Sequence, residues 1–257
     1  MFSKIVCIVI TFSTVVATDI ASSKFTKCFQ NENIFNCSGQ ELLTLPETDY
    51  IPSNIATLDV SFNNLVNISF LNYHELSYSV LTLNLSHNRI SVISSNAFKS
   101  LNNTLYLDLS NNLVSGHTLK DMDLSDLRRL RHLKLSHNPL KVIHSDTFNF
   151  LEYPSVTYLD LTNCEIKELE SESMEIRSLE YLDLSWNQLA AFKESSFHMM
   201  PSLKTLDLSH NWITVLNEMP YMPELIILSL DNNAIETIAI KKRIEDFSDN
   251  LQELYLR

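Results

Sequence analysis

The fold is decided by the stretch Leu83-Asn84-Leu85-Ser86-His87-Asn88-Arg89-Ile90, which recurs as Leu206-Asp207-Leu208-Ser209-His210-Asn211-Trp212-Ile213. Both copies follow the pattern Leu-x-Leu-x-x-Asn-x-Leu, with Ile in place of the last leucine. Six further copies run Leu58 to Leu65, Leu107 to Val114, Leu133 to Leu140, Leu159 to Ile166, Leu182 to Leu189 and Leu228 to Ile235. Such regularity predicts one elongated repeat domain in place of one or two ordinary globular domains.

Each copy has an anchor residue at its sixth position. The anchors are Asn63, Asn88, Asn112, Asn138, Cys164, Asn187, Asn211 and Asn233, at gaps of 25, 24, 26, 26, 23, 24 and 22 residues. Repetition at this period with Asn or Cys at the anchor is the leucine-rich repeat signature. Because an amide side chain both donates and accepts, we expect the anchors to form a structural ladder that satisfies backbone groups of the turns. Cys164 donates only weakly, so the ladder should be softest there.

The residues around Leu-x-Leu alternate between apolar and polar, which is strand periodicity. In one copy we expect Leu133 and Leu135 to point inward, and His132, Lys134 and Ser136 to point outward. About twenty residues join successive strands, too many for a hairpin, so the strands must be parallel. We predict an α/β fold: a right-handed leucine-rich repeat solenoid, or horseshoe, with a parallel concave β-sheet and an irregular or short-helical convex side.

A second apolar position follows ten residues after each anchor. Its residues are Tyr73, Phe98, Met122, Phe148, Met174, Phe197 and Tyr221. The pattern fails at Arg243, where we expect Phe247 to serve. A ligand-binding box is the alternative, but recurrence in every repeat favours a buried spine beneath the convex side.

The domain boundaries follow from the two ends. Residues 1–17 read as a signal peptide, because Lys4 precedes an apolar run that is shorter than the roughly 20 residues needed to span a bilayer. We expect an N-terminal cap at 18–53 and repeats at 54–257, with eight strand motifs and a truncated ninth at 251–257. Because that strand stops before an anchor, we expect the front part of a longer protein, with membrane attachment only through a C-terminal tail absent from this chain.

The cysteines and the glycosylation sequons are typical of a protein that enters the secretory pathway. Cys28 and Cys37 flank a short polar segment, which suits a disulfide in an oxidising compartment. Asn-x-Ser/Thr glycosylation sequons occur at Asn36, Asn67, Asn84 and Asn102. We therefore predict a glycoprotein that is secreted or held at the extracellular face of the plasma membrane.

The repeat of about 24 residues with Phe before the next leucine resembles the "typical" extracellular leucine-rich repeats found in Toll-like receptors, Slit and chaoptin. The resemblance covers residues 28 to 257, and the stretches Cys37-Ser38-Gly39, Leu45-Pro46 and Ile51-Pro52 resemble the N-terminal cap of that class. Such caps commonly carry four cysteines, whereas this one has two. The resemblance implies roles such as innate immune sensing or cell adhesion.

The charge argues against polyanionic partners. Loss of Lys4 with the signal peptide takes the formal net charge from −12 to −13. Nucleic acid and anionic lipid both need basic faces, so we expect neither as a partner. Arg128, Arg129 and Arg131 do cluster, but they lie between strands, where a solvated face is the simpler interpretation.

The outward middle position of the strands carries several carboxylates. It reads Asp59, Asn84, Asp108, Lys134, Asp160, Asp183, Asp207, Ser229 and Tyr255. Adjacent strands lie about 4.8 Å apart, so Asp160, Asp183 and Asp207 should form a ladder of like charges. A bound cation or acid–base catalysis are alternatives to simple solvated carboxylates. Without a Ser/His/Asp arrangement or metal-spaced His/Cys cluster, we predict no catalytic residue, metal, cofactor or enzyme activity.

Aromatic residues form the strongest candidate for a binding surface. The predicted ligand-binding set is Tyr106, His132, Tyr158, Tyr181, Trp186 and Trp212. The first four precede the first strand leucine in consecutive repeats, and the two tryptophans lie at strand ends. Aromatic anchors among polar groups mark protein–protein hot spots; individually exposed aromatics without a partner are the alternative. A glycan on Asn84 would cover the early repeats of the concave face.

We predict an extracellular recognition module that binds a protein ligand or co-receptor through its concave or lateral face, in innate immune recognition or cell-surface signalling. A homophilic cell-adhesion protein or an extracellular-matrix structural protein is the main alternative. A hydrolase that uses the concave carboxylates is a remote one.

Overall fold

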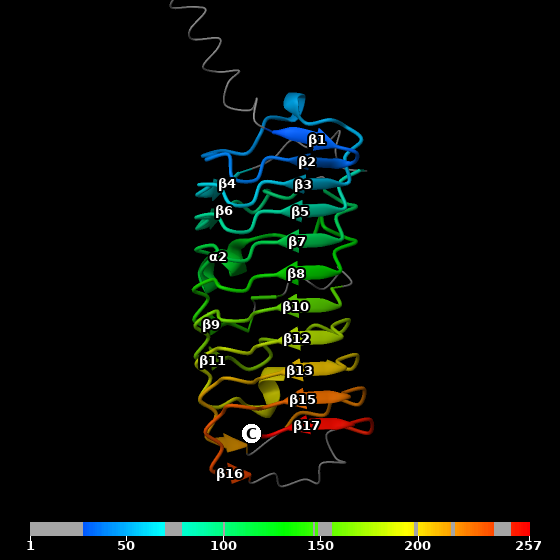
Figure 1. Ribbon diagram of the computed structural model, residues 1–257. Helices are drawn as coiled ribbons and strands as arrows, with labels where there is room; N and C mark the ends of the chain where they lie inside the picture. Colours follow the sequence, from blue (N-terminus) through cyan, green and yellow to red (C-terminus); the bar gives the residue numbers. More distant parts are fainter. Residues whose placement is uncertain are drawn as a thin grey trace, which may run out of the picture.

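A computed structural model describes residues 28–69, 79–99, 101–145, 147–148, 156–197, 200–216, 219–238 and 248–257. Within these residues the chain forms an elongated solenoid, and one long sheet runs down its length (Figure 1). The strand order of this sheet is β1-β2-β3-β5-β7-β8-β10-β12-β13-β15-β17. From β2 onward every neighbouring pair is parallel, so the predicted fold class is confirmed. The predicted signal segment 1–17, Tyr73, Arg243 and Phe247 lie outside the described residues.

The elements are short, as a repeat of this length requires. The strands of the long sheet are β1 (Phe29–Asn31), β2 (Ile34–Asn36), β3 (Thr57–Asp59), β5 (Thr82–Asn84), β7 (Tyr106–Asp108), β8 (His132–Lys134), β10 (Tyr158–Asp160), β12 (Tyr181–Asp183), β13 (Thr205–Asp207), β15 (Ile227–Ser229) and β17 (Glu253–Tyr255). Two-residue strands form three further pairs: β4 (Asn67–Ile68), β6 (Val92–Ile93), β9 (Val142–Ile143), β11 (Glu168–Leu169), β14 (Val215–Leu216) and β16 (Thr237–Ile238). Among the described residues the helices are α2 (Gly116–Asp121) and the 3-10 turns η1 (Thr48–Tyr50) and η4 (Glu194–Phe197).

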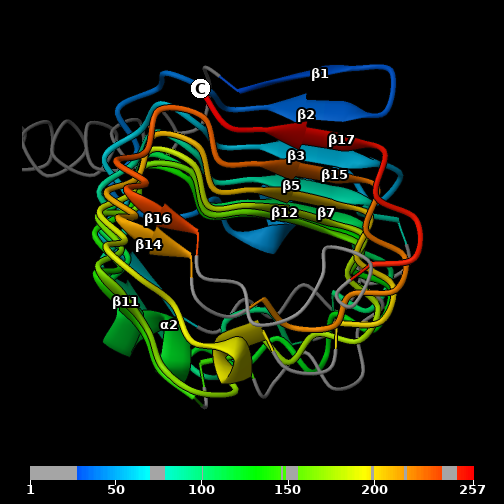
Figure 2. The same cartoon turned by 90° about the horizontal axis from the view of Figure 1, so that it is seen from below.

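Alternation along each strand places the leucines in the core. In β8, Leu133 is fully buried, His132 is half-buried and Lys134 is exposed. The short pairs β4–β6, β9–β11 and β14–β16 lie along one flank of the solenoid, beyond one end of the strands of the long sheet (Figure 1). Seen along the solenoid axis, α2 lies further round from this flank (Figure 2). One correction concerns Ser136, predicted to point outward, which is only 8% exposed. It lies in the turn after the strand, where the alternation has ended.

The anchor asparagines form the predicted ladder. The Nδ2 group of Asn187 donates to Leu161 O and Leu184 O, both at 2.9 Å. Its Oδ1 atom accepts from the backbone N–H groups of Cys164 at 2.9 Å and Ile166 at 3.0 Å in the preceding repeat. A buried amide thus satisfies groups in two repeats at once, which an apolar residue could not do.

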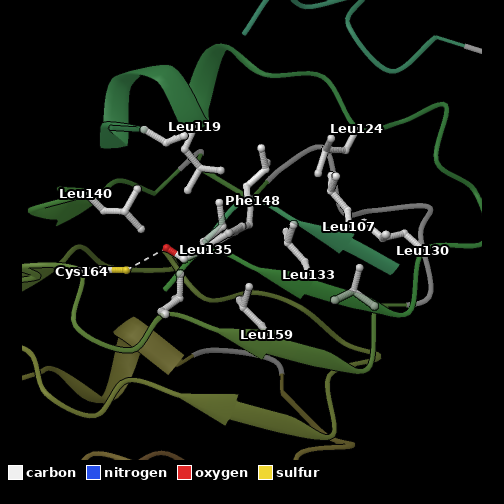
Figure 3. Packing of buried hydrophobic residues seen from close by; sticks show 14 of the residues in the cluster. Leu107, Leu119, Leu124, Leu130, Leu133, Leu135, Leu140, Phe148, Leu159 and Cys164 are labelled. Atoms are coloured by element: carbon white, nitrogen blue, oxygen red, sulfur yellow. Dashed lines mark hydrogen bonds between the residues drawn. The ribbon is translucent and has the colours of Figure 1, made fainter. Parts of the chain in front are cut away.

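Cys164 is the weak rung of this ladder. Its Sγ atom lies 3.2 Å from Leu135 O, the contact dashed in Figure 3. In a regular repeat the amide oxygen accepts an N–H from the repeat before, as Asn138 Oδ1 accepts from Val114 N at 2.8 Å. The corresponding donor opposite Cys164 is Leu140 N, which bonds to Asn138 O at 2.9 Å instead.

The backbone beside Cys164 is deformed. Lys141 and Glu165 adopt φ values of 66° and 56°, in the left-handed region that residues with a Cβ rarely occupy. The neighbouring carbonyls press against Gly116, the first residue of α2. A Cβ at that glycine would lie 2.7 Å from Val142 O and 2.8 Å from Leu140 O. The close approach therefore requires glycine at this position.

The predicted convex spine is largely confirmed. Phe98, Met122, Phe148, Met174 and Phe197 are all buried. Tyr221 is the exception: it is 56% exposed, and its hydroxyl donates to Asp249 Oδ2 at 3.0 Å. The adjacent Met222 is fully buried in its place. The phenol hydroxyl needs a polar partner, which the thioether does not.

The N-terminal end is closed by a hairpin. Strands β1 and β2 pair antiparallel, and β2 continues the parallel sheet to β3. A disulfide joins Cys28 to Cys37, as predicted. The buried side chains of Phe35 and Leu42 extend the core beneath this hairpin. The first repeat is thereby shielded from water, which a repeat array needs at its ends.

Candidate functional site

Four residues of the predicted aromatic set form one continuous stack on the sheet face. Tyr106, His132, Tyr158 and Tyr181 stand on β7, β8, β10 and β12, and the register places each beside the next. Their ring centroids are successively 4.4, 5.4 and 4.7 Å apart. The first and last pairs are stacked, with interplanar angles of 15° and 4°, and the middle pair is tilted. We call these four residues the ring stack.

The ring stack ends at two threonines. Thr82 on β5 lies beside Tyr106, and Thr205 on β13 lies beside Tyr181. Because neither threonine has a ring, the outer faces of the terminal tyrosines have no aromatic neighbour among the described residues. These two faces are the places where a partner's side chain could continue the stack.

Burial favours the neutral form of three rings in the ring stack. Burial lowers the pKa of His132, and the Lys134 ammonium lowers it further. Burial also raises the pKa of Tyr158 and of Tyr181, and nearby aspartate carboxylates raise both further. Neutral rings can pack face to face along the sheet without charge repulsion.

The carboxylate ladder lies directly beside the ring stack. Asp160, Asp183 and Asp207 are opposite one another in register on β10, β12 and β13. The Oδ1 atom of each accepts the backbone N–H two residues ahead, at 3.0, 2.9 and 2.8 Å respectively. Asn84 does the same for Ser86 N at 3.1 Å. These side chains therefore close the turn that ends each strand, a role that the sequence pattern had not indicated.

A shallow hollow lies at the N-terminal end of the ring stack. It has a volume of about 280 Å³ and is lined by Thr82, Asn84, Tyr106, Leu107, Asp108, His132 and Lys134. The hollow arises where the row of rings steps from Tyr106 to the small Thr82. Lys134 interrupts the carboxylates here, since its strand neighbours in the same row are Asp108 and Asp160.

A second row of exposed or half-buried side chains runs along the residues just before the anchors. Its members are Phe62, His87, Asn111, His137, Asn163, Trp186, His210 and Asn232, all with φ between 52° and 57°. Trp186 stacks on His210 at 3.8 Å, and Phe62 stacks on His87 at 4.1 Å. Apart from Trp186, sequence reasoning had not assigned this row to the site. Its signal was present in the constant spacing of one residue before each anchor.

The two tryptophans of the predicted set lie apart from the ring stack. Trp186 belongs to the second row, and Trp212 follows the anchor Asn211. Both are 58% exposed. Among the described residues no ring contact joins either tryptophan to the ring stack. The structure thus brings together four members of the predicted set and places the other two on the neighbouring turns.

The four sequons occupy different surfaces. Asn67 on β4 and Asn102 are exposed, away from the long sheet. Asn36 on β2 and Asn84 on β5 are half-buried on the sheet. Asn84 lines the hollow beside Tyr106, so a glycan there would occupy the N-terminal end of the ring stack.

Among the described residues, no group of three or more His, Cys, Asp or Glu side chains is arranged to hold a metal ion. In the same part of the chain, no helix has the length and apolar character required to cross a bilayer.

The sequence matches a known repeat family. The family model described as "Leucine rich repeat" matches residues 79–140, 128–189, 154–213 and 177–235, which together cover well over half of the chain. Transforming growth factor beta activator LRRC33 of Danio rerio is 30% identical over 216 residues, covering 79% of this chain and 30% of that protein. Toll-like receptor 3 of Homo sapiens is 36% identical over 165 residues, which cover 61% of this chain and 18% of the receptor. Adenylate cyclase of Schizosaccharomyces pombe is 28% identical over 214 residues, which cover 77% of this chain and 12% of the cyclase.

Solved structures agree on the fold. A crystal structure of a TLR13–ssRNA13 complex superposes with a TM-score of 0.65 and 26% sequence identity, covering 82% of this chain and 29% of that one. The chain therefore spans at most about a third of the length of these relatives.

Proposed function

This chain belongs to the leucine-rich repeat family, and from that premise we propose that it is an extracellular module that recognises a protein ligand. Its relatives include innate immune receptors and an activator of transforming growth factor beta, which supports recognition as the general role. We place the ligand on the sheet face, over the ring stack, in cell-surface signalling or innate immune recognition.

The observation that carries this proposal is the ring stack itself. Four aromatic rings stand in register on four adjacent strands, and polar side chains surround them. Rigid aromatic side chains lose little conformational freedom on binding and supply a large contact area, which makes them frequent hot spots of protein interfaces. Because the rings already pack on one another, the surface is organised before a partner arrives.

We propose an extracellular location with a signal peptide at 1–17, a cap at 18–53 and repeats at 54–257. The Cys28–Cys37 disulfide supports it, since disulfides persist in oxidising compartments. Expression in a secretory host should release a chain that begins at Thr18 by N-terminal sequencing. Retention of residues 1–17 on the secreted protein would contradict the proposed cleavage site.

A protein ligand fits this face better than a polyanion. The crystallised relative was solved with single-stranded RNA. On this chain, however, three carboxylates stand beside the ring stack. Phosphate backbones require lysine and arginine contacts, so the acidic ladder favours a protein partner over a nucleic acid.

The test is capture from an array of extracellular protein domains, with the chain displayed as a tetramer. For any domain that is captured, the double variant Tyr158→Ala/Tyr181→Ala should weaken binding at least tenfold, because hot-spot truncation costs about 2 kcal/mol or more. The matched control is Tyr50→Ala/Tyr221→Ala, which removes two exposed tyrosines elsewhere. Capture that the first variant leaves unchanged would refute the ring stack as the binding site.

A further inference from the structure

The carboxylates beside the ring stack form a row that has one cationic neighbour, Lys134, at its N-terminal end. Asp160, Asp183 and Asp207 are opposite one another in register on adjacent strands. Neighbouring strands of a sheet lie about 4.8 Å apart. Within the described parts of the chain, no lysine or arginine forms an ion pair with any of the three. Like charges opposite one another destabilise a sheet, so this row opposes folding to a small extent.

The turn that ends each of these strands needs a hydrogen-bond acceptor but not the negative charge of an aspartate. Each of these carboxylates uses Oδ1 to accept a backbone N–H two residues ahead. Asn84 makes the same contact with Ser86 N on β5, so a neutral amide serves equally well. The local structure therefore explains a short polar acceptor at this position, but it does not explain three consecutive negative charges. The Oδ2 atom of Asp183 accepts the Tyr181 hydroxyl at 3.4 Å, and the remaining negative charge is available to a partner.

The ring stack adds a specific place for a cation. One face of Tyr181 packs on Tyr158 at 4.7 Å, and the strand neighbour on the other side is Thr205, which has no ring. Asp183 and Asp207 lie on the same two strands as Tyr181 and Thr205. A guanidinium laid on the outer face of Tyr181 would have both carboxylates on adjacent strands beside it, and arginine favours this combination of stacking and ion pairing.

The spacing indicates how a partner would present its cations. Three carboxylates on adjacent strands span two strand separations, or about 10 Å. On an α-helix, residues at i, i+3 and i+7 lie on one face and span about 10.5 Å. In an extended strand the residues at i, i+2 and i+4 span about 13 Å, which is a poorer match.

We propose that the sheet face over β10, β12 and β13 docks a basic helical segment of the protein partner, with arginines at i, i+3 and i+7 against Asp160, Asp183 and Asp207. The proposal rests on the recognition function given above and assigns the chemistry of its ligand. Charge complementarity carries it, together with the overall net charge of −12. Lys134 on β8 bounds the acidic row on its N-terminal side, so the segment should extend toward β13.

The probe is a fluorescein-labelled, alanine-rich helical peptide with three arginines at i, i+3 and i+7, titrated with the whole chain in fluorescence anisotropy. We expect the triple variant Asp160→Asn/Asp183→Asn/Asp207→Asn to weaken binding at least tenfold, with the turns kept intact by the amides. The double variant Asp59→Asn/Asp108→Asn is the control, because both residues make the same turn contact outside the proposed dock. It should bind within twofold of the unaltered chain.

Raising the salt concentration from about 50 to about 300 mM should weaken peptide binding to the unaltered chain, because the Debye length shortens. Failure of the peptide to bind, equal binding by the triple variant, or binding of single-stranded RNA to the same face would each overturn the proposal. A natural partner could require Tyr158 and Tyr181 for binding and still bind the triple variant normally. That result would support the proposed recognition function and refute only the docking of a basic segment.

Discussion

Replacing the anchor Asn187 by alanine tests the ladder most directly. The amide is 4% exposed and serves two repeats. Its loss leaves three backbone groups without a described partner: Cys164 N, Ile166 N and Leu161 O. Leu184 O keeps the Asn211 amide as a donor. Each buried backbone group that loses its hydrogen-bond partner costs about 1–3 kcal/mol. If the surrounding backbone relaxes in part, three such groups should lower the free energy of unfolding by about 4 kcal/mol.

The matched comparison is Cys164→Ala at the equivalent position one repeat earlier. The thiol donates to Leu135 O, but that carbonyl also accepts from the Asn138 amide at 2.8 Å. No backbone group is orphaned, so the expected cost is about 1 kcal/mol for the lost sulfur contacts and a small cavity.

Urea unfolding followed by circular dichroism would measure both variants against the unaltered chain, with the slope m compared to verify that each unfolds as one unit. Equal losses for Asn187→Ala and Cys164→Ala would refute the reasoning, since the two anchors would then be energetically alike. A loss below about 1.5 kcal/mol for Asn187→Ala would also contradict it, because a loss of that size accounts for at most one unpaired buried group and not for three.

Three further predictions follow from particular contacts. Gly116→Ala should lower the free energy of unfolding by about 2 kcal/mol despite the better helix propensity of alanine, because the alanine Cβ would meet two carbonyl oxygens. The control His117→Ala, at an exposed position of the same helix, should change the free energy of unfolding little. Equal losses of stability in the two variants would contradict the close approach at Gly116. Burial raises the pKa of the Cys164 thiol from 9.0 to about 12, so the unfolded chain releases this proton first. The thiol's contribution to stability should therefore be complete below about pH 9 and fall as the pH rises toward 12, a loss that Cys164→Ala should lack in urea titrations at each pH. Asn84→Gln should remove one glycan, which intact-mass measurement would detect, and expose the hollow beside Tyr106. A mass that changes only by the one added CH2 group would show that this sequon is unoccupied.

The repeat pattern predicts much of this molecule because each of its positions has one constant environment. A leucine of Leu-x-Leu meets the leucines of the repeats before and after it, so its burial follows from the period alone. For the same reason the anchor ladder and the stacking order of Tyr106, His132, Tyr158 and Tyr181 could be anticipated. Their register is set by the pairing of parallel strands, and the aromatic character is visible at one position of four consecutive copies.

Other features depend on details that the period does not constrain. Tyr221 occupies a spine position by spacing, yet the loop turns it outward to Asp249 and buries Met222. The repeats differ in length by several residues, and the difference is taken up in the connections, where no constant partner exists.

The sequence by itself determined the solenoid, the inward leucines, the anchors and the row of rings, because these arise from contacts between equivalent positions of neighbouring repeats. Only the tertiary structure decided which carboxylates are committed to turns, which face of Tyr181 has no ring beside it, and why Gly116 must be glycine. Those properties depend on close contacts between residues at different positions of the repeat. Side-chain rotamers and local backbone shifts determine such contacts, and the repeat pattern specifies neither.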